Sequence, residues 1–414
     1  MKKYFLFSLF VILFCSFQIR TYPQTNDVDS IITSIVSSIN SDSVRYIVQN
    51  LQDFQTRFLL TPNRFDAADW IENRFHEIGI TDVERDSFMC HTTYIVDTTT
   101  LQINIIATIP GTTRPDEVYI IGGHYDCFAY GDIFNSAPGA DDNASGTAAA
   151  LELARALVQS GYQPEATIKF IAFAAEELMF FGDAGCRHYA QNAKADSMDI
   201  RLMINCDMIS NTNSPLEESR VHINYYSGFE TLLNFAINTS QQFSIISTIA
   251  GSLNQQSDSY PFYEQGYPAL YFEEDDFSPF YHTTGDTIGN YSMEFCREVI
   301  KSGGATLLKY MMTTIPVSVD ESKSDLPDVI SLYQNYPNPF NPVTTIEYAL
   351  PQSENVVLKI YNILGEEIAN LVKEEQKAGR HSVKFDGGRL PSGIYIYKLT
   401  AGKFSAAKKL VLLK

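Results

Sequence analysis

The stretch TIKFIAFAAEE (residues 167–177) joins an apolar run to two adjacent acids. An unbroken apolar run of this length predicts a strand that is buried on both faces, as in a parallel sheet. Neighbouring residues on a strand point to opposite faces, and burying an unpaired carboxylate costs free energy. Glu176 and Glu177 therefore raise the question of why two acids stand where a core strand ends.

Apolar runs of similar length recur along the chain, and helical patterns separate several of them. The segment SGTAAALELARALVQ predicts a helix over 145–159, with Ser145 as its N-cap and Gly161 near its end. Residues 26–80 also have helical periodicity. The other predicted strands are 101–109, 117–126, 201–210, 221–226 and 268–275. Buried strands that alternate with helices predict an α/β fold, in which a mainly parallel, mixed sheet is sandwiched by helices.

The composition of the chain changes near Ile315. Residues 316–330 are polar and contain proline, which is typical of a linker. Residues 331–414 alternate polar and apolar side chains between turn signals such as PNPFNP and PSG. This pattern predicts a small all-β sandwich domain. We therefore expect an α/β domain at 26–315, a linker, and a C-terminal β-sandwich.

The N-terminal segment MKKYFLFSLFVILFCSF has two lysines followed by a short apolar run. This order is typical of a secretory signal peptide, and the run is short for a membrane span, which needs about 20 residues. We predict a signal peptide at 1–22, no stable membrane span, and export through the periplasm to the cell surface or the medium. The six cysteines form no CxxC pair, and we assign no disulfide.

The net charge of the chain is −19, and the acidic excess lies before residue 331. A nucleic-acid partner would need a basic face, so we predict none.

Polar residues that can bind metal follow three of the predicted strands. His124 and Asp126 follow EVYIIGG, the acid pair follows TIKFIAFAA, and Asp207 follows RLMINC. The carboxyl ends of parallel strands meet at one edge of a sheet, where α/β proteins place their sites. Two loops add the remaining candidates, Asp141 and Asp142 of APGADDNASG (137–146) and His282 of FYHTTGDT (280–287).

Imidazole and carboxylate ligands together suit Zn²⁺ or a related divalent ion. One catalytic zinc needs about three protein ligands, and this set is large enough for two ions that share a carboxylate. Cations would also offset the repulsion between several buried carboxylates. Each segment alone is common as a structural histidine, a helix start or a turn. Their combination predicts a metal site.

The segments HYD, PGADDNASG, AEE, INCDM and HTTGD, in this order, resemble the M28 family of zinc exopeptidases. The resemblance is greatest to bacterial secreted aminopeptidases and covers about residues 40–315. It implies two Zn²⁺ ions per chain with Asp142 between them. The remaining ligands would be Glu177 and His282 for one ion, and His124 and Asp207 for the other.

The same resemblance implies the reaction, which is release of N-terminal residues from peptides and proteins. Glu176 would be the general base, taking a proton from a water shared by the ions and passing it to the leaving amine. Asp126 would orient the imidazole of His124. The family also has a cis peptide bond after the bridging aspartate, which here is the bond Asp142–Asn143.

Three departures from the family pattern concern the pocket, and none of them removes a ligand. Ala175 stands where the family often has glycine before the acid pair. The segment LMFFGDAGCRHYA, which includes Met179 and Phe180, is longer than the usual turn. The triplet SDS at 257–259 replaces a commoner SDH, so we infer no role for the missing histidine.

The sequence leaves other functions open. A glutaminyl-cyclase-like acyltransferase resembles this domain but uses one zinc, and a carboxypeptidase would need a cationic subsite for the substrate carboxylate. A non-enzymatic surface protein would use the fold only for binding, and the complete ligand set with Glu176 argues against it. Counting bound zinc and measuring ammonia release from an N-terminal glutamine peptide would separate the cyclase from an aminopeptidase.

The C-terminal segment begins LYQNYPNPFNPVTTIEYAL and ends with a basic, apolar stretch. Over nearly its whole length it is similar to the C-terminal sorting domain of type IX secretion substrates. This resemblance implies the outer-membrane type IX machinery as a partner, with release or surface attachment afterwards. The alternative is an ordinary β-sandwich accessory or carbohydrate-binding module.

Overall fold

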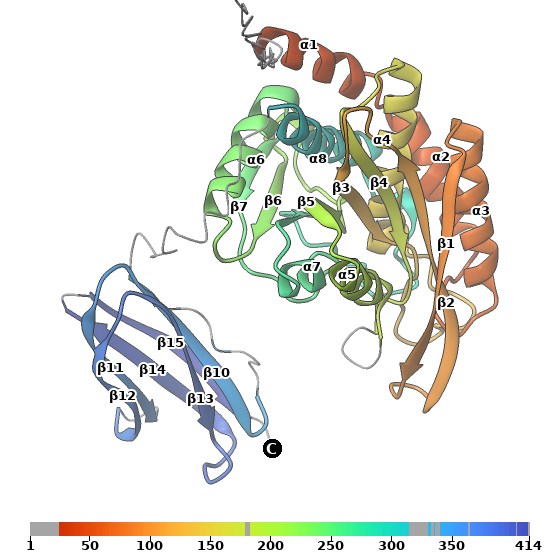
Figure 1. Cartoon of the computed structure of the whole chain (residues 1–414). Coiled ribbons are helices and arrows are strands. Elements are labelled where there is room, and N and C mark those ends of the chain that lie inside the picture. Colours follow the sequence, from red (N-terminus) through yellow and green to blue (C-terminus); the bar gives the residue numbers. More distant parts are fainter. Residues whose placement is uncertain are drawn as a thin grey trace, which may run out of the picture. The chain divides into compact units, whose positions relative to one another are not determined.

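The computed structural model describes residues 25–178, 183–313, 330–332, 335, 340–362, 365–402 and 404–412. The chain divides into two compact units, Met1–Ile315 and Pro316–Lys414 (Figure 1). The predicted signal peptide, nearly all of the predicted linker, and Met179 and Phe180 lie outside the described residues. The predicted fold class is confirmed in both units: a mixed α/β sheet with helices, followed by antiparallel β structure.

The first unit is built on an eight-stranded sheet. In chain order its strands are β1 (Asp82–Thr92), β2 (Thr98–Ile109), β3 (Arg114–His124), β4 (Ala166–Phe173), β5 (Asp199–Cys206), β6 (Arg220–Tyr225), β7 (Ser247–Ala250) and β8 (Ala269–Glu274). Their order across the sheet is β1-β2-β4-β3-β5-β8-β6-β7. The four central strands β4, β3, β5 and β8 run parallel, so their carboxyl ends reach the same edge.

Helices cover both faces of this sheet (Figure 1). They are α1 (Thr25–Val36), α2 (Ser41–Gln52), α3 (Asn63–Ile78), α4 (Gly146–Ser160), α5 (Gly185–Ala195), α6 (Glu230–Phe243), α7 (Tyr260–Glu264) and α8 (Met293–Thr313). On β3, Ile120 packs in the core cluster that contains residues of α5 and α7, whereas Ile121 packs in the cluster of α1 to α4, α6 and α8. Burial on both faces explains why the central strands have unbroken apolar runs.

All six predicted strands are present, but several of their limits differ. β3 ends at His124 and β5 ends at Cys206, so the metal-binding candidates beyond them lie in loops. Two further strands, β1 and β7, were not predicted. β1 exposes most of its first half and β7 is short and largely exposed at the opposite edge, so neither has the apolar run of a central strand.

The helix predicted over 145–159 is α4, and Gly161 ends it with a left-handed φ of 70°. Ser145 is at the N-cap position of α4, but its side chain makes no capping hydrogen bond, because its hydroxyl donates to the Asp141 carbonyl oxygen at 2.7 Å. Asn143 caps the helix instead, since its side-chain oxygen accepts the backbone N–H of Gly146 at 2.8 Å.

The second unit is the predicted β-sandwich. One sheet contains β9 (Ser331–Leu332), β10 (Val343–Leu350) and β13 (Gly379–Asp386), and the other contains β11 (Glu354–Asn362), β12 (Glu367–Gln376), β14 (Gly393–Ala401) and β15 (Phe404–Leu412). The strand pairs are antiparallel. Ile346 and Tyr348 of one sheet share a buried core with Leu358, Tyr397 and Leu410 of the other.

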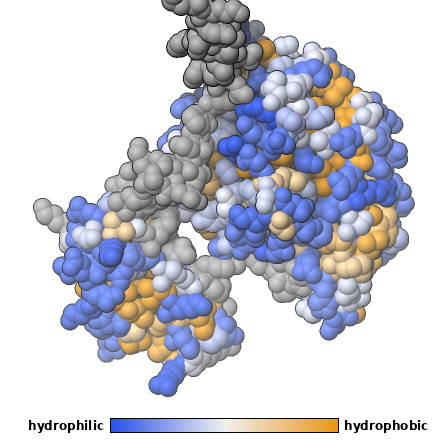
Figure 2. Space-filling model, viewed as in Figure 1, coloured by the Kyte–Doolittle hydropathy of each residue, from blue (hydrophilic) through white to orange (hydrophobic). Residues whose placement is uncertain are grey.

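The described residues include no helix with the length and apolar character needed to cross a membrane. Figure 2 shows that the visible face of the first unit is mostly hydrophilic, with smaller hydrophobic areas between.

Candidate metal centre

Three neighbouring strands bring their carboxyl ends to one place at the edge of the sheet. β4, β3 and β5 are adjacent and parallel. His124 is the last residue of β3, Asp207 directly follows β5, and Glu176 lies three residues beyond β4. Asp142 comes from the turn Ala140–Ser145 before α4, and His282 from the loop after β8.

The structure brings together all five residues predicted as metal ligands, with Asp142 between the two histidines. Its Oδ1 lies 3.3 Å from His124 Nε2, and its Oδ2 lies 3.2 Å from His282 Nε2. His124 Nε2 is also 3.5 Å from Asp207 Oδ2, while His282 Nε2 is 2.7 Å from Glu177 Oε2. The five side chains thus form two groups that share one carboxylate.

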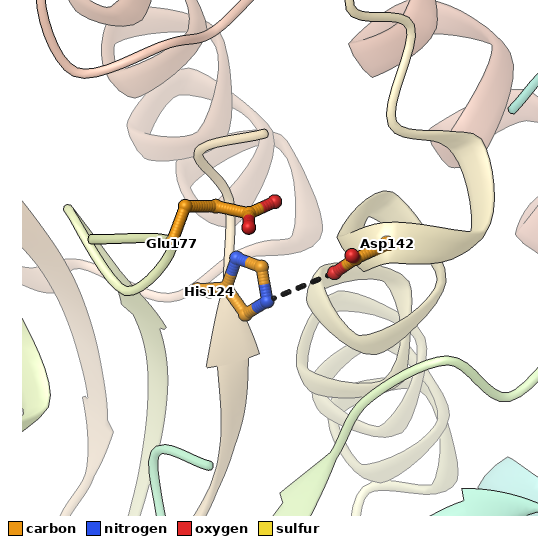
Figure 3. A group of neighbouring side chains, drawn as sticks. All are labelled: His124, Asp142 and Glu177. Carbon is orange, nitrogen blue, oxygen red and sulfur yellow. Dashed lines mark ion pairs between the residues drawn. The ribbon is translucent and has the colours of Figure 1, made fainter. Parts of the chain in front are cut away.

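Ligand atoms of His124, Asp142 and Glu177 also lie within 4.8 Å of one another, and Figure 3 shows these side chains converging. The shorter distance pairs Glu177 with His282, so we assign it to the His282 group. Glu176 is farther from this arrangement, since its Oε2 lies 3.8 Å from His124 Nε2.

Two buried carboxylate oxygens in these groups have no hydrogen-bond partner among the described residues. They are Glu177 Oε1 and Asp207 Oδ1. Orphaned buried carboxylate atoms are costly unless a cation binds them. The donor set of imidazole nitrogen and carboxylate oxygen is the one that zinc prefers. The residues present therefore fit bound zinc.

The charges in this cluster are unbalanced. Burial raises the pKa of Glu177 to about 7 and that of Asp207 to about 6. Burial alone would lower the pKa of His282, but the neighbouring Glu177 and Asp142 raise it to about 11. The acids outnumber the imidazoles that offset them, so the chain does not neutralise its own site.

Asp126 contacts both His124 and the turn that carries Glu176 and Glu177. Its carbonyl oxygen lies 3.2 Å from His124 Nδ1 and its carboxylate Oδ1 lies 3.4 Å from the same nitrogen. These acceptors favour the tautomer with the proton on Nδ1, which leaves the Nε2 lone pair facing the cluster. The Asp126 carboxylate also accepts the backbone N–H groups of Glu176 and Glu177, at 3.0 and 3.2 Å. It therefore fixes the turn that carries both acids.

The backbone conformation of that turn shows why glycine would suit the position where this chain departs from the family pattern. Ala175, directly before the acid pair, has a φ of 59°. This is the left-handed region, which glycine occupies without the steric cost that a Cβ atom adds.

The turn before α4 is held by residues whose roles the sequence did not indicate. Asp286 of the segment HTTGDT accepts the backbone N–H groups of Asp141 and Asp142, at 2.9 and 3.2 Å. Asp141 Oδ1 accepts the backbone N–H of Ser210 at 2.9 Å, so this acid serves the fold and is not part of either ligand group. The bond Asp142–Asn143 is cis, as the resemblance implies.

Arg57 is the largest supporting residue that sequence reasoning missed. Its side chain is fully buried, and it donates to four backbone carbonyl oxygens. The acceptors are Tyr125 at 2.6 Å, Leu51 at 2.8 Å, Pro138 at 2.7 Å and Gly139 at 2.8 Å. A Cβ atom at Gly139 would lie 2.7 Å from the Arg57 guanidinium, so only glycine fits there. Arg57 lies between α2 and α3, and a single arginine carries no local signal of this role.

A cavity of about 410 Å³ opens beside the ligand groups. Much of its wall is aromatic, from Tyr94, Phe128, Tyr130, Phe277 and Tyr281, and β8 contributes Tyr271 and Glu273. The cysteines of the described residues are buried and free.

Each of the two units contains a stretch that matches a known family. Residues 104–302 match peptidase family M28, and residues 334–413 match the secretion system C-terminal sorting domain. A probable zinc metalloprotease of Pyrenophora teres f. teres is 34% identical over 205 residues, which are 45% of this chain and 42% of the relative. The chain spans about two fifths of the length of the first curated relatives it matches.

One relative matches over a longer stretch. A probable leucine aminopeptidase of Arthroderma otae is 26% identical over 293 residues, covering 68% of this chain and 75% of that protein.

Two solved structures have the same fold. LapB from Legionella pneumophila is 22% identical, with a TM-score of 0.58 over 70% of this chain and 76% of that one. A glutaminyl cyclase of Bacteroides thetaiotaomicron is 18% identical, with a TM-score of 0.53 over 66% of this chain and 98% of that one. The fold therefore also occurs in a protein that is named as a glutaminyl cyclase. The family matches therefore relate residues 104–302 to peptidase family M28 and residues 334–413 to the secretion system C-terminal sorting domain.

Proposed function

We propose that the protein is a secreted aminopeptidase that uses two Zn²⁺ ions per chain to hydrolyse the N-terminal peptide bond of peptides and proteins. The observation that carries this proposal is the sharing of Asp142 by two groups of buried ligands. With Asp142, each group supplies three ligands, which is the number at a catalytic zinc that keeps an open position. One group would hold its ion through His124 and Asp207, and the other through His282 and Glu177.

When bound, the two ions would polarise the scissile carbonyl and lower the pKa of a water molecule. The chain's own residues would prepare the site for this chemistry. Asp126 would keep the His124 Nε2 lone pair directed at the ligand group, and it would hold the backbone turn of Glu176 and Glu177 in place.

Glu176 would be the general base. It lines the cavity and lies outside both ligand groups, so its carboxylate is available for a proton. Burial raises the pKa of Glu176 well above its ordinary value, which suits a group that first accepts and then donates a proton. Glu176 would take the proton of the attacking water and deliver it to the leaving amine.

We also propose the cellular route. The sorting domain at 334–413 supports handling by the type IX secretion machinery, with final location at the cell surface or outside the cell. In this proposal residues 1–22 are a signal peptide, 26–315 the peptidase domain, 316–330 the linker and 331–414 the sorting domain.

The proposed activity can be tested with a peptide library read by mass spectrometry. We expect zinc-loaded protein to release N-terminal residues, to lose this activity in a chelator, and to regain it with Zn²⁺. If zinc-loaded protein released no N-terminal residue from a broad library, the aminopeptidase proposal would be wrong. The same spectra distinguish the alternatives, because a cyclase would release ammonia from N-terminal glutamine and a carboxypeptidase would shorten the other end.

A further inference from the structure

The cavity beside the ligand groups contains a carboxylate that the proposed reaction does not use. Glu273 lies on β8, whose residue Phe272 accepts the backbone N–H of Asp207 at 3.2 Å. Glu273 is therefore next to the segment that carries a metal ligand, and it lines the same cavity. It belongs to neither group around Asp142.

Neutral donors fix this carboxylate from the side of the sheet. Glu273 Oε2 accepts the side-chain N–H of Asn224 at 2.8 Å. Asn224 is itself held, because its oxygen accepts the backbone N–H of Ser252 at 2.9 Å. Tyr271, two residues earlier on the same face of β8, also hydrogen-bonds to Glu273. The carboxylate is thus positioned before any ligand arrives.

No lysine, arginine or histidine among the described residues forms an ion pair with Glu273. None of their ion pairs includes it, and the residues that line the cavity contain no lysine or arginine. Its partner across the sheet, His222, instead pairs with Asp275, which also pairs with Arg220. Two acids only two positions apart therefore differ: Arg220 and His222 form ion pairs with Asp275, whereas Glu273 forms no ion pair among the described residues and is affected by the His222 charge only from a distance.

The rest of the cavity suits a long side chain with a cationic end. Phe128 packs against Tyr94 and Tyr130, with ring centroids 5.9 and 5.1 Å apart, and Phe277 packs against Tyr281 at 5.0 Å. Aromatic faces attract ammonium and guanidinium groups, and the methylene stem of such a side chain packs on apolar surface. A neutral side chain would cover Glu273 and leave its charge without a partner.

We propose that Glu273 selects substrates whose N-terminal residue is lysine or arginine, by pairing with the cationic end of that side chain. This specificity rests on the proposed aminopeptidase function, since it concerns the residue that the enzyme releases.

The test compares lysyl and norleucyl anilides, because norleucine has the four-carbon side chain of lysine without the ammonium group. For zinc-loaded wild type we expect kcat/KM to be about 10- to 100-fold higher for the lysyl substrate, as for one charged hydrogen bond. Glu273→Gln keeps an oxygen for Asn224 and removes the charge. It should bring the two substrates close to equality, mainly by slowing the lysyl one.

Asp276→Asn is the matched control. It removes one negative charge beside the cavity residue Phe277, and the asparagine oxygen can still accept the backbone N–H of Asn213, now 2.8 Å from Asp276. We expect this variant to keep the wild-type preference. A measurement without any variant is inhibition of the wild type by free amino acids, in which lysine should bind about 10-fold or more tightly than norleucine.

Two results would overturn the specificity while leaving the aminopeptidase proposal intact. One is a wild type that shows no preference for the lysyl substrate and binds lysine no better than norleucine. The other is an equal loss on both substrates in Glu273→Gln, which would mean that the carboxylate binds the α-amine common to both. Absence of anilide release from every substrate would instead contradict the proposed function itself.

Discussion

The first unit buries two kinds of carboxylate, and they differ in where their counter-charges come from. Glu152 of α4 is fully buried, and it accepts hydrogen bonds from the Asn40 backbone at 3.0 Å, the Ser43 hydroxyl at 2.6 Å and Arg155 at 2.8 Å. Glu298 of α8 is buried in the same way and lies 2.9 Å from the Lys301 ammonium group. The chain supplies these structural acids with cations and donors.

The acids at the edge of the sheet are buried without such partners. Among the described residues no lysine or arginine pairs with Asp142, Glu177 or Asp207, and only two histidines do. Burial raises the pKa of Glu177 and Asp207, whereas Lys301 and other donors outweigh burial and lower the pKa of Glu298. The contrast supports the proposal that cations from outside the chain neutralise the acids at the edge of the sheet.

Asp142→Asn should have the largest effect, because this one residue belongs to both ligand groups. We expect the variant to lose zinc from both positions and activity to fall to background, since neither group retains three ligands. Zinc content and anilide hydrolysis measured on the same preparation would show this. A variant that kept its zinc and its activity would show that Asp142 is not shared between two ions.

Substitutions of the adjacent acids Glu176 and Glu177 should have different effects on zinc binding. Glu176→Gln should keep its zinc and lose about 10²- to 10⁴-fold in kcat, because only the proton acceptor is removed. Glu177→Gln should weaken zinc binding as well, since it removes a ligand. Zinc titration of both variants, together with kcat, tests this difference. Loss of zinc in Glu176→Gln would reverse the two roles.

Substitution of a structural acid such as Glu152 should instead affect the stability of the fold and not the binding of zinc. Glu152→Gln disturbs a buried acceptor of several donors, so it should lower the free energy of unfolding by about 1–3 kcal/mol while leaving the zinc content unchanged. Denaturant unfolding of zinc-loaded protein measures the loss. The control is Glu165→Gln, because this half-exposed acid lies 3.4 Å from Arg114 and should change stability by less than about 1 kcal/mol. Loss of zinc in Glu152→Gln would contradict the separation of the two kinds of acid.

Two of the edge acids, Asp207 and Glu177, should also respond to pH with a sign opposite to that of the structural acid Glu298. In the metal-free fold Asp207 and Glu177 have pKa values of about 6 and about 7, above the ordinary 3.8 and 4.5. A raised pKa means that the fold binds these protons more tightly than the unfolded chain does. This contribution to stability is fully present below the ordinary pKa values, and it is lost as the pH rises through the raised pKa values. Glu298 has a lowered pKa, so its contribution is lost as the pH falls.

We therefore expect chelator-treated protein to melt at lower temperature as the pH rises from about 5 to about 8, and zinc-loaded protein to show a smaller change. Melting curves in the two conditions provide the comparison. A metal-free protein that gained stability over this range would contradict the predicted sign.

The smallest effect concerns the turn that presents the edge acids. Ala175→Gly removes a Cβ atom from a residue with left-handed φ, which relieves steric strain in the fold. Glycine also adds conformational entropy to the unfolded chain, which offsets part of this gain. The free energy of unfolding should therefore rise by about 0.5–1 kcal/mol. Ala174→Gly is the matched control, because Ala174 is not among the residues with positive φ and should lose stability on substitution. Equal effects of the two changes would argue against strain at Ala175.

The sequence predicted the centre of the sheet better than its edges. β4 and β5 are buried on both faces, so their residues form unbroken apolar runs that can be recognised without the structure. β1 pairs with β2 alone and has a largely polar first half, and β7 has only four residues. Such strands depend on the neighbour that they pair with, which local sequence does not contain.

The residues of the site also differ in how well the local sequence predicts them. The five candidate ligands and Glu176 could be found because they stand at strand ends or in short motifs. Arg57 and Asp286 could not, since the contacts that place them at the site reach segments 68 to 145 positions away in the chain. Glu273 was hidden in the strand run PALYFEED, and only the cavity distinguishes it from a solvent-exposed acid.

The most direct test of the edge acids as a two-cation site is the zinc stoichiometry of the wild-type chain. Metal-stripped protein would be titrated with Zn²⁺, and bound zinc would be counted by mass spectrometry alongside anilide hydrolysis. We predict two ions per wild-type chain, and the activity should return fully only when both are bound. Full activity with a single zinc per chain would contradict the shared role of Asp142.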